Sequence, residues 1–522
     1  MCDHRVVTSP PLHDASDGDR PFAVIDIGSN SGRMIVFRLQ EGGHLDVLED
    51  ARAPLRLARA LREGNALGEE AIERTLEALR DFRAVADGVG ATSITAVATS
   101  AVRDAADADL LLERASAIGI PLQVIQGDAE ARLGFLGAVH DLPVTSGLTM
   151  DVGGGSTELS LFDHRRLVRS WTVPLGSLRI SDLHLTDDPP TDKEMKRARQ
   201  EIASVVGEAE LPALDPEGAL VGIGGTIRNL AKMDLRRSEY PLPLLHGYVL
   251  SSASLGDIVE DLAARKMSRR AKTGGLNPDR ADTIVGGALI VQGIADHVGA
   301  DEVVVSSRGL REGLALDRFG DEIPPAWWVR TISIATLGSR FTTWSAELGS
   351  RRAQLAATLH ESADPGAPDA VREMLGHAAT VLDVGRAIDY YDRFSHAAMI
   401  VTAADVAGFS HADLGLLTAI LRQADDDTRL GSYGRLLVDE SSRTAVLRAA
   451  TALALADELN RRMQPGVPAT LSCTFRPNGF EVVAPVPAGW RPRGVADRFR
   501  EVFGRPLIVV PAELAAEPVP PA

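Results

Sequence analysis

The chain has few aromatic residues and almost no cysteine. Phe, Trp and Tyr make up 4% of its 522 residues, so aliphatic side chains and alanine must fill its hydrophobic cores. Hydrophobic residues of all kinds make up 45%, which is enough for ordinary cores. The two cysteines, Cys2 and Cys473, exclude a disulfide framework, and Cys2 falls in a polar stretch, 1–20, in which we expect a disordered tail.

Long apolar runs are also absent. No stretch approaches the ~18 apolar residues of a membrane-spanning helix. The N-terminus is charged from Asp3 onward and lacks the apolar core of a secretory signal. We therefore expect a cytoplasmic protein with no membrane partner. The net charge of −17 argues against nucleic acid as a partner, and a cleft for a polyanion would have to gather arginines or a metal ion locally.

Three consecutive glycines between two apolar runs form the most informative motif. In TMDVGGGSTEL (149–159), glycines 153–155 follow Asp151 and precede Glu158. Such a turn costs stability as pure structure, and the usual reason for it is close approach of backbone N–H groups to an anion such as phosphate. The flanking carboxylates suit a divalent cation bound to that phosphate. A glycine-rich hairpin without a ligand is the alternative, because a lone glycine loop is a weak signal.

A second stretch repeats this order of residues. In FAVIDIGSNSGRMIVFRL (22–39), an apolar strand leads to Asp26, a glycine turn follows, and a second strand begins at Met34. Two similar hairpins predict two related half-domains that face each other across a cleft. A third glycine turn, VGIGGT (221–226), opens into a predicted helix over 227–233.

Strands and helices alternate through the first 320 residues. Predicted strands at 94–98 and 122–125 flank a predicted helix at 110–117, and this alternation indicates mixed sheets with helices on their faces. Prolines near 323–327 indicate a linker, and the region that follows has helical character. The predicted division is a tail at 1–20, half-domains at 21–142 and 143–320, a helical domain at 325–464, a small α+β unit at 465–511 and a loose tail at 512–522.

The three glycine turns, in this order along the chain, give the sequence a resemblance to the superfamily of actin, sugar kinases and heat-shock chaperones. Within it, the details resemble the exopolyphosphatase and guanosine pentaphosphate phosphatase (Ppx/GppA) family. The matching stretches are IDIGSNSGRMIV (25–36), VATSAVRDA (97–105), GDAEARLGFLGAV (127–139), DVGGGSTELSLF (151–162), VGIGGTIRNLAK (221–232) and GLREGL (309–314). The resemblance implies an α/β protein with two actin-like, ribonuclease H-like half-domains around a cleft, and a magnesium-dependent hydrolase of polyphosphate or of a guanosine polyphosphate.

The resemblance also implies catalytic roles. Glu130 matches the general base that deprotonates the attacking water, although the family has a second glutamate where this chain has Ala129. Taken alone, a first-turn glutamate is more simply a partner of the helix dipole. Arg103 matches an arginine on the phosphate, where its planar fork suits bidentate contact. An arginine at a strand end is otherwise usually solvated.

Ligands for the metal and the substrate follow from the same match. Asp151 is expected to be catalytic and to hold Mg²⁺ or another divalent cation with Glu158 and Asp26, whereas hairpin capping is the structural alternative. The expected substrate-binding residues, which are otherwise turn formers, are Ser29, Asn30, Ser31, Gly153, Gly154, Gly155, Ser156, Thr157, Gly224, Gly225, Thr226 and Arg228. Weaker candidates are Arg132, Arg308, Arg311 and His246, the last of which is as readily a buried structural histidine.

The C-terminal region resembles the helical domain of longer family members, which is similar to HD phosphohydrolases. VLDVG (381–385), His396 and Asp457 carry the match, and His377 lies nearby. Leu382 stands where the histidine of the His–Asp pair is expected, so the metal site of an HD domain is incomplete. We expect a structural or polyphosphate-docking role for this degenerate domain.

These observations favour an exopolyphosphatase that removes phosphate one unit at a time from a chain end. The closest alternative is the same chemistry on guanosine pentaphosphate, because the shared motifs do not separate the two. An actin-like nucleotide-binding protein, or a sensor of polyphosphate or alarmone without catalysis, are alternatives of another class. We expect a homodimer with no nucleic-acid partner.

Overall fold

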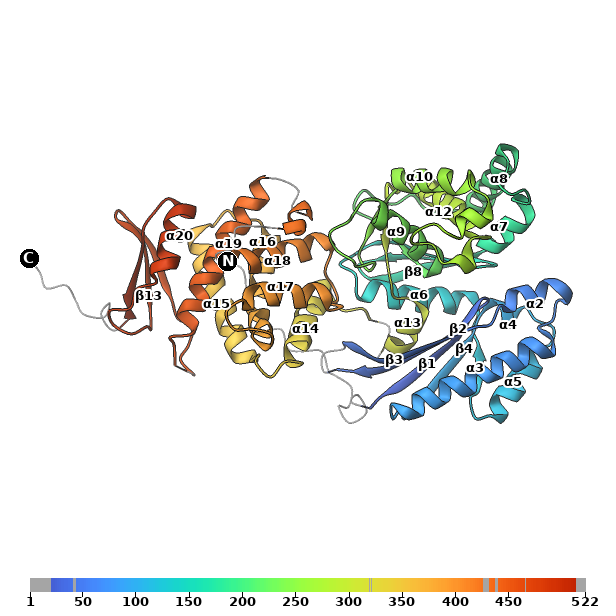
Figure 1. Ribbon diagram of the computed structural model, residues 1–522, viewed down its shortest axis with the longest axis horizontal. Coiled ribbons are helices and arrows are strands. Elements are labelled where there is room, and N and C mark those ends of the chain that lie inside the picture. Colours follow the sequence, from blue (N-terminus) through green and yellow to red (C-terminus); the bar gives the residue numbers. More distant parts are fainter. Residues whose placement is uncertain are drawn as a thin grey trace, which may run out of the picture. The chain divides into compact units, whose positions relative to one another are not determined.

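A computed structural model describes residues 20–40, 44–318, 320, 322–425, 431–436, 440–464 and 466–512 (Figure 1). The predicted tails, and Cys2 with them, lie outside these residues except for Arg20 and Ala512. The contacts divide the chain into two compact units, Met1–Val329 and Arg330–Ala522, and we describe each by itself.

The first sheet of the N-terminal unit has five strands in the order β3-β2-β1-β4-β5. They are β1 (Phe22–Ile27), β2 (Ser31–Leu39), β3 (Leu45–Pro54), β4 (Ile94–Ala98) and β5 (Leu122–Val124). β1 pairs antiparallel with β2 and parallel with β4, so the sheet is mixed as predicted. Its helices are α2 (Leu57–Gly64), α3 (Gly68–Gly88), α4 (Ser100–Arg103) and α5 (Ala108–Ala117).

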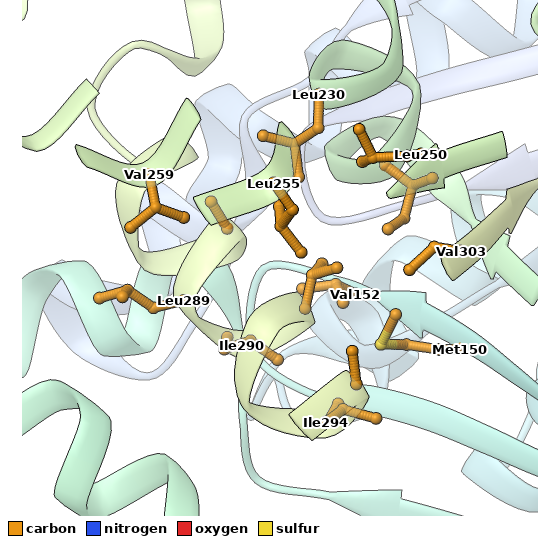
Figure 2. Close-up of a cluster of buried hydrophobic side chains, with 14 of the residues drawn as sticks. Met150, Val152, Leu230, Leu250, Leu255, Val259, Leu289, Ile290, Ile294 and Val303 are labelled. Carbon is orange, nitrogen blue, oxygen red and sulfur yellow. The ribbon is translucent and has the colours of Figure 1, made fainter. Parts of the chain in front are cut away.

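The second sheet has six strands in the order β10-β11-β9-β6-β7-β8 and is also mixed. They are β6 (Gly147–Val152), β7 (Thr157–Asp163), β8 (Arg166–Val173), β9 (Ala219–Ile223), β10 (Val249–Ser251) and β11 (Glu302–Val305). The associated helices are α7 (Ser177–His184), α8 (Asp192–Glu208), α9 (Gly224–Arg237), α10 (Ser252–Ala263), α11 (Met267–Arg270), η1 (Pro278–Arg280) and α12 (Ile284–Val298). Figure 2 shows some of the apolar side chains that fill the core on one face of this sheet, with Met150 and Val303 from strands and Leu255 and Ile290 from α10 and α12.

Two helices link the sheets. α6 (Gly127–His140) sends Leu133 into the core of the first sheet and Phe135 into the core of the second. α13 (Leu310–Asp317) packs beside it, and Gly313 permits the close approach, because a Cβ there would lie 1.9 Å from the Leu133 carbonyl oxygen. The beginning of α6 is thereby held at a fixed place between the two halves.

The C-terminal unit is mostly helical, as predicted. Its helices are α14 (Ala326–Ser339), α15 (Ala346–Ala363), α16 (Asp369–Val381), η2 (Leu382–Ala387), α17 (Arg393–Ala403), α18 (His411–Ala424), η3 (Gly431–Leu436) and α19 (Glu440–Asn460). A three-stranded sheet follows, β12 (Ser472–Arg476), β13 (Gly479–Ala484) and β14 (Leu507–Pro511), with α20 (Arg493–Phe503) between its last two strands.

Several elements of the N-terminal unit were not predicted. β3 is an edge strand whose residues are mostly exposed or half-buried, so hydrophobic periodicity gives little signal there. The helix of the third glycine turn is longer than expected, since α9 runs from Gly224 to Arg237. No helix within the described ranges is long and apolar enough to cross a bilayer.

Candidate active site

A cleft of about 760 Å³ opens between the two sheets of the N-terminal unit. Its walls are the β1–β2 turn, the β6–β7 turn, the beginning of α9, the segment 267–283 and the loop between β11 and α13. All three predicted glycine turns therefore meet at one cavity.

The two hairpins are built alike. Asp26 pairs with Arg33 across the first, and Asp151 pairs with Glu158 across the second, each one residue outside the last pair before the turn. The N–H of Gly28 donates to the Ser31 carbonyl at 3.2 Å, and Gly153 donates to Ser156 at 3.0 Å. The residue that pairs with the aspartate differs: it is Arg33 in the first hairpin and Glu158 in the second.

Neighbouring segments use the carbonyl oxygens of these turns. Ser177 N–H donates to the Gly153 carbonyl at 2.9 Å, and Leu178 N–H donates to the Gly154 carbonyl at 3.0 Å. In the first turn, Asn30 accepts from the N–H groups of residues 55 and 56 at 3.0 and 2.9 Å. Since these carbonyl lone pairs are engaged within the protein, they do not oppose an anion in the cleft.

The third turn needs glycine because side chains lie against its backbone. Gly224 has φ +83°, and a Cβ there would lie 2.2 Å from Asp151 Oδ1. A Cβ on Gly225 would lie 2.2 Å from Nη2 of Arg280. The Asp151 carboxylate and the Arg280 guanidinium are thus both set against the N-terminus of α9.

Four carboxylates converge at the cleft, and burial raises the pKa of each. Burial, with the charges of Glu158, Asp151 and Asp26, raises the pKa of Glu130 to about 9, although Arg103 opposes the shift. Burial and Asp151 raise the pKa of Glu158 to about 7 against the hydrogen bond from Ser156. Burial raises the pKa of Asp26 to about 6 and that of Asp151 in the same direction. A positive charge entering the cleft would favour the ionised forms of all four.

Arg103 lies beside Glu130. Its Nη1 is 3.4 Å from Glu130 Oε2 and donates to the Ile125 carbonyl at 2.9 Å. Arg103 is absent from the described cleft lining. It contacts Glu130, the predicted base, while its contact with phosphate stays a prediction.

Seven arginines among the described residues line the cleft. They are Arg33, Arg56, Arg59, Arg228, Arg280, Arg308 and Arg311. Arg33 illustrates their crowding, because burial and the charges of Arg228, Arg311 and Arg52 lower its pKa to about 10. Seven carboxylates also line the cleft: Asp26, Glu130, Asp151, Glu158, Asp279, Asp282 and Glu312. Opposed charges are thus concentrated where a phosphate and a cation would bind together.

Most of the predicted residues reach the cleft. Lining it are Asp26, Ser29, Asn30, Ser31, Glu130, Asp151, Gly153, Gly154, Ser156, Glu158, Gly224, Gly225 and Arg228. Thr157 and Thr226 are buried instead, and their hydroxyls donate to the carbonyls of Leu175 at 2.5 Å and Val152 at 3.2 Å. Gly155 is exposed but is not among the lining residues. Their predicted roles in binding have no support from this placement.

Sequence reasoning missed four of the arginines. Arg33 sits inside the first matching stretch, so its place opposite Asp26 gave a signal that was available. Arg56 and Arg59 come from the chain after β3, and Arg280 comes from η1. Of the weaker candidates, Arg308 and Arg311 line the cleft, while Arg132 forms an ion pair with Asp317 at 2.8 Å.

The carboxylates of the cleft suit a divalent cation that is bound by few protein ligands. Within the described ranges no group of three or more His, Cys, Asp or Glu side chains has the geometry of a metal site. Asp26 Oδ1 is buried and has no hydrogen-bond partner among the described residues. Magnesium keeps several waters and takes one or two carboxylates with substrate oxygens. Asp26, Asp151 and Glu158 can supply those carboxylates.

In the C-terminal unit, an arginine lies between two of the acids that the sequence analysis singled out, Asp383 and Asp457. Arg352 Nη2 is 2.8 Å from Asp383 Oδ2, and its Nη1 is 3.2 Å from Asp457 Oδ1. Asp457 also pairs with Arg393 at 2.7 Å. His396 lies on α17, and Nδ1 of its ring is buried without a hydrogen-bond partner among the described residues. The two acids are therefore neutralised by the chain itself.

Comparisons with known proteins agree with this architecture. The model of the Ppx/GppA phosphatase family matches residues 35–322, and that of Ppx/GppA phosphatase domain III matches residues 329–491. Exopolyphosphatase 2 of Mycobacterium tuberculosis is 31% identical over 314 residues, which are 57% of this chain and 98% of that protein. Exopolyphosphatase 1 of Mycobacterium leprae is 29% identical over 316 residues, with 59% and 93% covered.

Solved structures show the same correspondence. The Ppx/GppA family member of Aquifex aeolicus is 28% identical, with a TM-score of 0.52, and the match covers 57% of this chain and 97% of that one. An exopolyphosphatase from Cytophaga hutchinsonii, 24% identical with a TM-score of 0.53 over 58% and 99% of the chains, shares the fold.

Proposed function

Because the chain belongs to the Ppx/GppA phosphatase family, we propose that it is a hydrolase that releases terminal orthophosphate from inorganic polyphosphate. The observation that carries the proposal is the meeting of Glu130, Asp151 and Glu158 in a cleft lined by arginines. Relatives named exopolyphosphatase, at about 30% identity, support it. Phosphoryl transfer needs mainly positioning and charge neutralisation, and these residues suit both tasks.

The composition of the cleft supports an inorganic chain as substrate. Among the described lining residues, none is aromatic, whereas seven are arginines. Arginine binds phosphate oxygens through its fork, and an aromatic side chain is the usual platform for stacking a base. A linear polyanion therefore matches this surface better than a nucleotide does.

Glu130 is the proposed general base. It lies in the first turn of α6, where Leu133 and Phe135 anchor the helix in both cores. Burial and the neighbouring carboxylates raise the pKa of Glu130, which favours the protonated carboxyl when no cation is nearby. Positive charge from Arg103 and from a bound cation would favour the carboxylate, which could then take a proton from the attacking water at Oε1 or Oε2.

The remaining residues would bind and orient the phosphate. Backbone N–H groups of the two hairpin turns and the beginning of α9 would hold its oxygens, while Arg228 would contact it from the side. One or two of the carboxylates of Asp151, Glu158 and Asp26 would hold a divalent cation, which when bound offsets the charge of the phosphate oxygens.

Guanosine pentaphosphate is the second candidate substrate. The terminal phosphates of polyphosphate and guanosine pentaphosphate offer the same chemistry, and the family description, Ppx/GppA, joins the names of both kinds of phosphatase. Arginine side chains can also stack on a base, so the arginines outside the glycine turns would be the discriminating surface. A sensor or nucleotide-binding role without catalysis is disfavoured by the intact set of Glu130, Asp151 and Glu158.

Phosphate release measured side by side tests these alternatives. The purified full chain with Mg²⁺ receives polyphosphate, guanosine pentaphosphate or ATP at equal terminal-phosphate concentration. We expect the fastest release from polyphosphate and little from ATP. Faster release from guanosine pentaphosphate would favour the second candidate, and binding without release from any of the three would favour the sensor.

A further inference from the structure

A half-buried polar cluster lies at the opposite end of α6 from Glu130. Asp141 caps the C-terminus of this helix, and its side chain is 19% exposed. His140 Nδ1 donates to Asp141 Oδ1 at 2.6 Å, and Arg308 Nε donates to Asp141 Oδ2 at 3.1 Å. Burial alone would raise the pKa of Asp141, but the bond from His140 and the charge of Arg308 hold it well below its usual range.

His246 ties the backbone of the cleft loop to the same cluster. Its Nε2 donates to the Asp141 carbonyl at 3.2 Å, which leaves Nδ1 to accept from Ser307 N–H at 3.3 Å. The Ser307 carbonyl in turn accepts from Arg228 Nη1 at 2.9 Å. The cluster therefore contacts the loop between β11 and α13 at consecutive residues.

Both arginines that this cluster holds line the cleft. Arg308 is bonded directly through Nε, and Arg228 is bonded through the Ser307 carbonyl. An arginine fixed through Nε keeps the plane and direction of its guanidinium defined, which lowers the cost of ordering it on a phosphate.

We propose that the side chain of Asp141 is a positioning group that orients Arg308 for the phosphates of the substrate, next to the His246–Ser307 contacts that hold Arg228 from the Asp141 backbone carbonyl. This inference rests on the proposed function and deepens it. It assigns to the His140–Asp141 dipeptide a role in substrate affinity rather than in chemistry. Asp141 acts through Arg308 and does not touch the substrate.

The test is a double-mutant cycle on kcat/KM for polyphosphate. Asp141→Asn keeps the size of the side chain but removes its charge, and we expect kcat/KM to fall about 10-fold or more, mainly through KM. In an Arg308→Ala background, the same substitution should cost at most a small fraction of that factor. Full additivity of the two substitutions would overturn the proposal.

Asp234→Asn is the matched control. Asp234 is a buried aspartate on α9 that accepts from the Tyr248 hydroxyl at 2.8 Å, and it does not line the cleft. We expect it to lower thermal stability without changing KM. If Asp141→Asn merely loses stability as Asp234→Asn does, with an unchanged KM, the role of Asp141 is structural and the proposal is wrong.

Two further measurements keep the outcome decisive. If Asp141→Asn does not fold, Arg308→Lys retains the charge without the Nε bond, and it should raise KM as Arg308→Ala does; parent kinetics would overturn the inference. A parent chain that neither releases phosphate nor binds tripolyphosphate in calorimetry would overturn the proposed function and this inference together. An active parent with an additive cycle would overturn this inference alone.

Discussion

Replacing Arg352 with methionine should destabilise the C-terminal unit strongly. Arg352 is 1% exposed, and its guanidinium bridges Asp383 and Asp457, which are 5% and 2% exposed. Methionine fills much of the same volume but leaves these carboxylates without their shared cation. Removing one partner of a buried ion pair typically costs about 3–5 kcal/mol, because the other charge stays buried.

The two acids should not suffer equally. Asp457 keeps Arg393 at 2.7 Å and Arg461 at 3.2 Å, whereas Asp383 keeps only the longer contact of 3.7 Å with Arg386 among the ion pairs of the described residues. Most of the cost should therefore fall on Asp383. A second substitution, Asp383→Asn, should restore more than half of the lost stability in the Arg352→Met background.

Arg351→Met is the matched control for burial and side-chain loss. Arg351 is 7% exposed, and its bonds go to the Asn460 side chain and to neutral carbonyls such as that of Gln464. Its loss leaves no charge unpaired and should cost about 1–3 kcal/mol. The assay is urea unfolding, monitored by hydrogen exchange of the backbone amides of α16 and α19. A local probe is needed because a chain of two units need not unfold in one step. Equal costs for the two arginine variants, or no rescue by Asp383→Asn, would refute the reasoning.

Other predictions concern the N-terminal unit. Asp151→Asn should raise the Mg²⁺ concentration needed for half-maximal phosphate release and lower the rate; an unchanged Mg²⁺ dependence would remove Asp151 from the proposed metal site. Arg103→Lys should lose much of the turnover, because lysine lacks the planar fork of arginine; parent kinetics in this variant would show that Arg103 does not contact the substrate. Higher salt should raise KM for polyphosphate, because salt screens the cleft arginines. Glu194 accepts bonds from Thr191 that lower its pKa from 4.5 to about 2, so its stabilising charge is fully present above pH ~4.5 and lost as the pH falls toward 2. Glu194→Gln should therefore lower the unfolding free energy by about 1–2 kcal/mol at pH 7 and by little near pH 2, as measured by urea titration at both pH values; an equal loss at both would contradict the capping role.

The local motifs of the site were predictable from the sequence. Asp26 and Asp151 end apolar strands before glycine turns, and strand pairing alone sets them at matching positions. Glu130 at the beginning of α6 followed from a motif with a helix behind it. These features depend on residues close together in the chain, which is why a single sequence carries them.

Contacts between distant segments were not predictable in the same way. Arg280 reaches the cleft from η1 because a glycine in another element leaves room for its guanidinium. Thr157 and Thr226 are polar and lie in glycine turns, yet packing turns them inward to carbonyl acceptors. Arg352 pairs with Asp383 and Asp457 through contacts across three helical segments, which no spacing indicates. The expected homodimer and the predicted domain boundaries stay predictions.

The central claim is that Glu130 is the base of a phosphate-releasing enzyme, and the most direct test compares Glu130→Gln with the parent chain. Glutamine keeps the size and hydrogen bonding of the side chain but cannot take the proton of water at neutral pH. Turnover of polyphosphate should fall by about 10²–10⁴-fold, while binding of polyphosphate measured by calorimetry should stay close to that of the parent. Turnover at the parent rate would contradict the account, because a helix-dipole partner predicts only a small loss of stability, below about 1 kcal/mol, and no selective loss of rate.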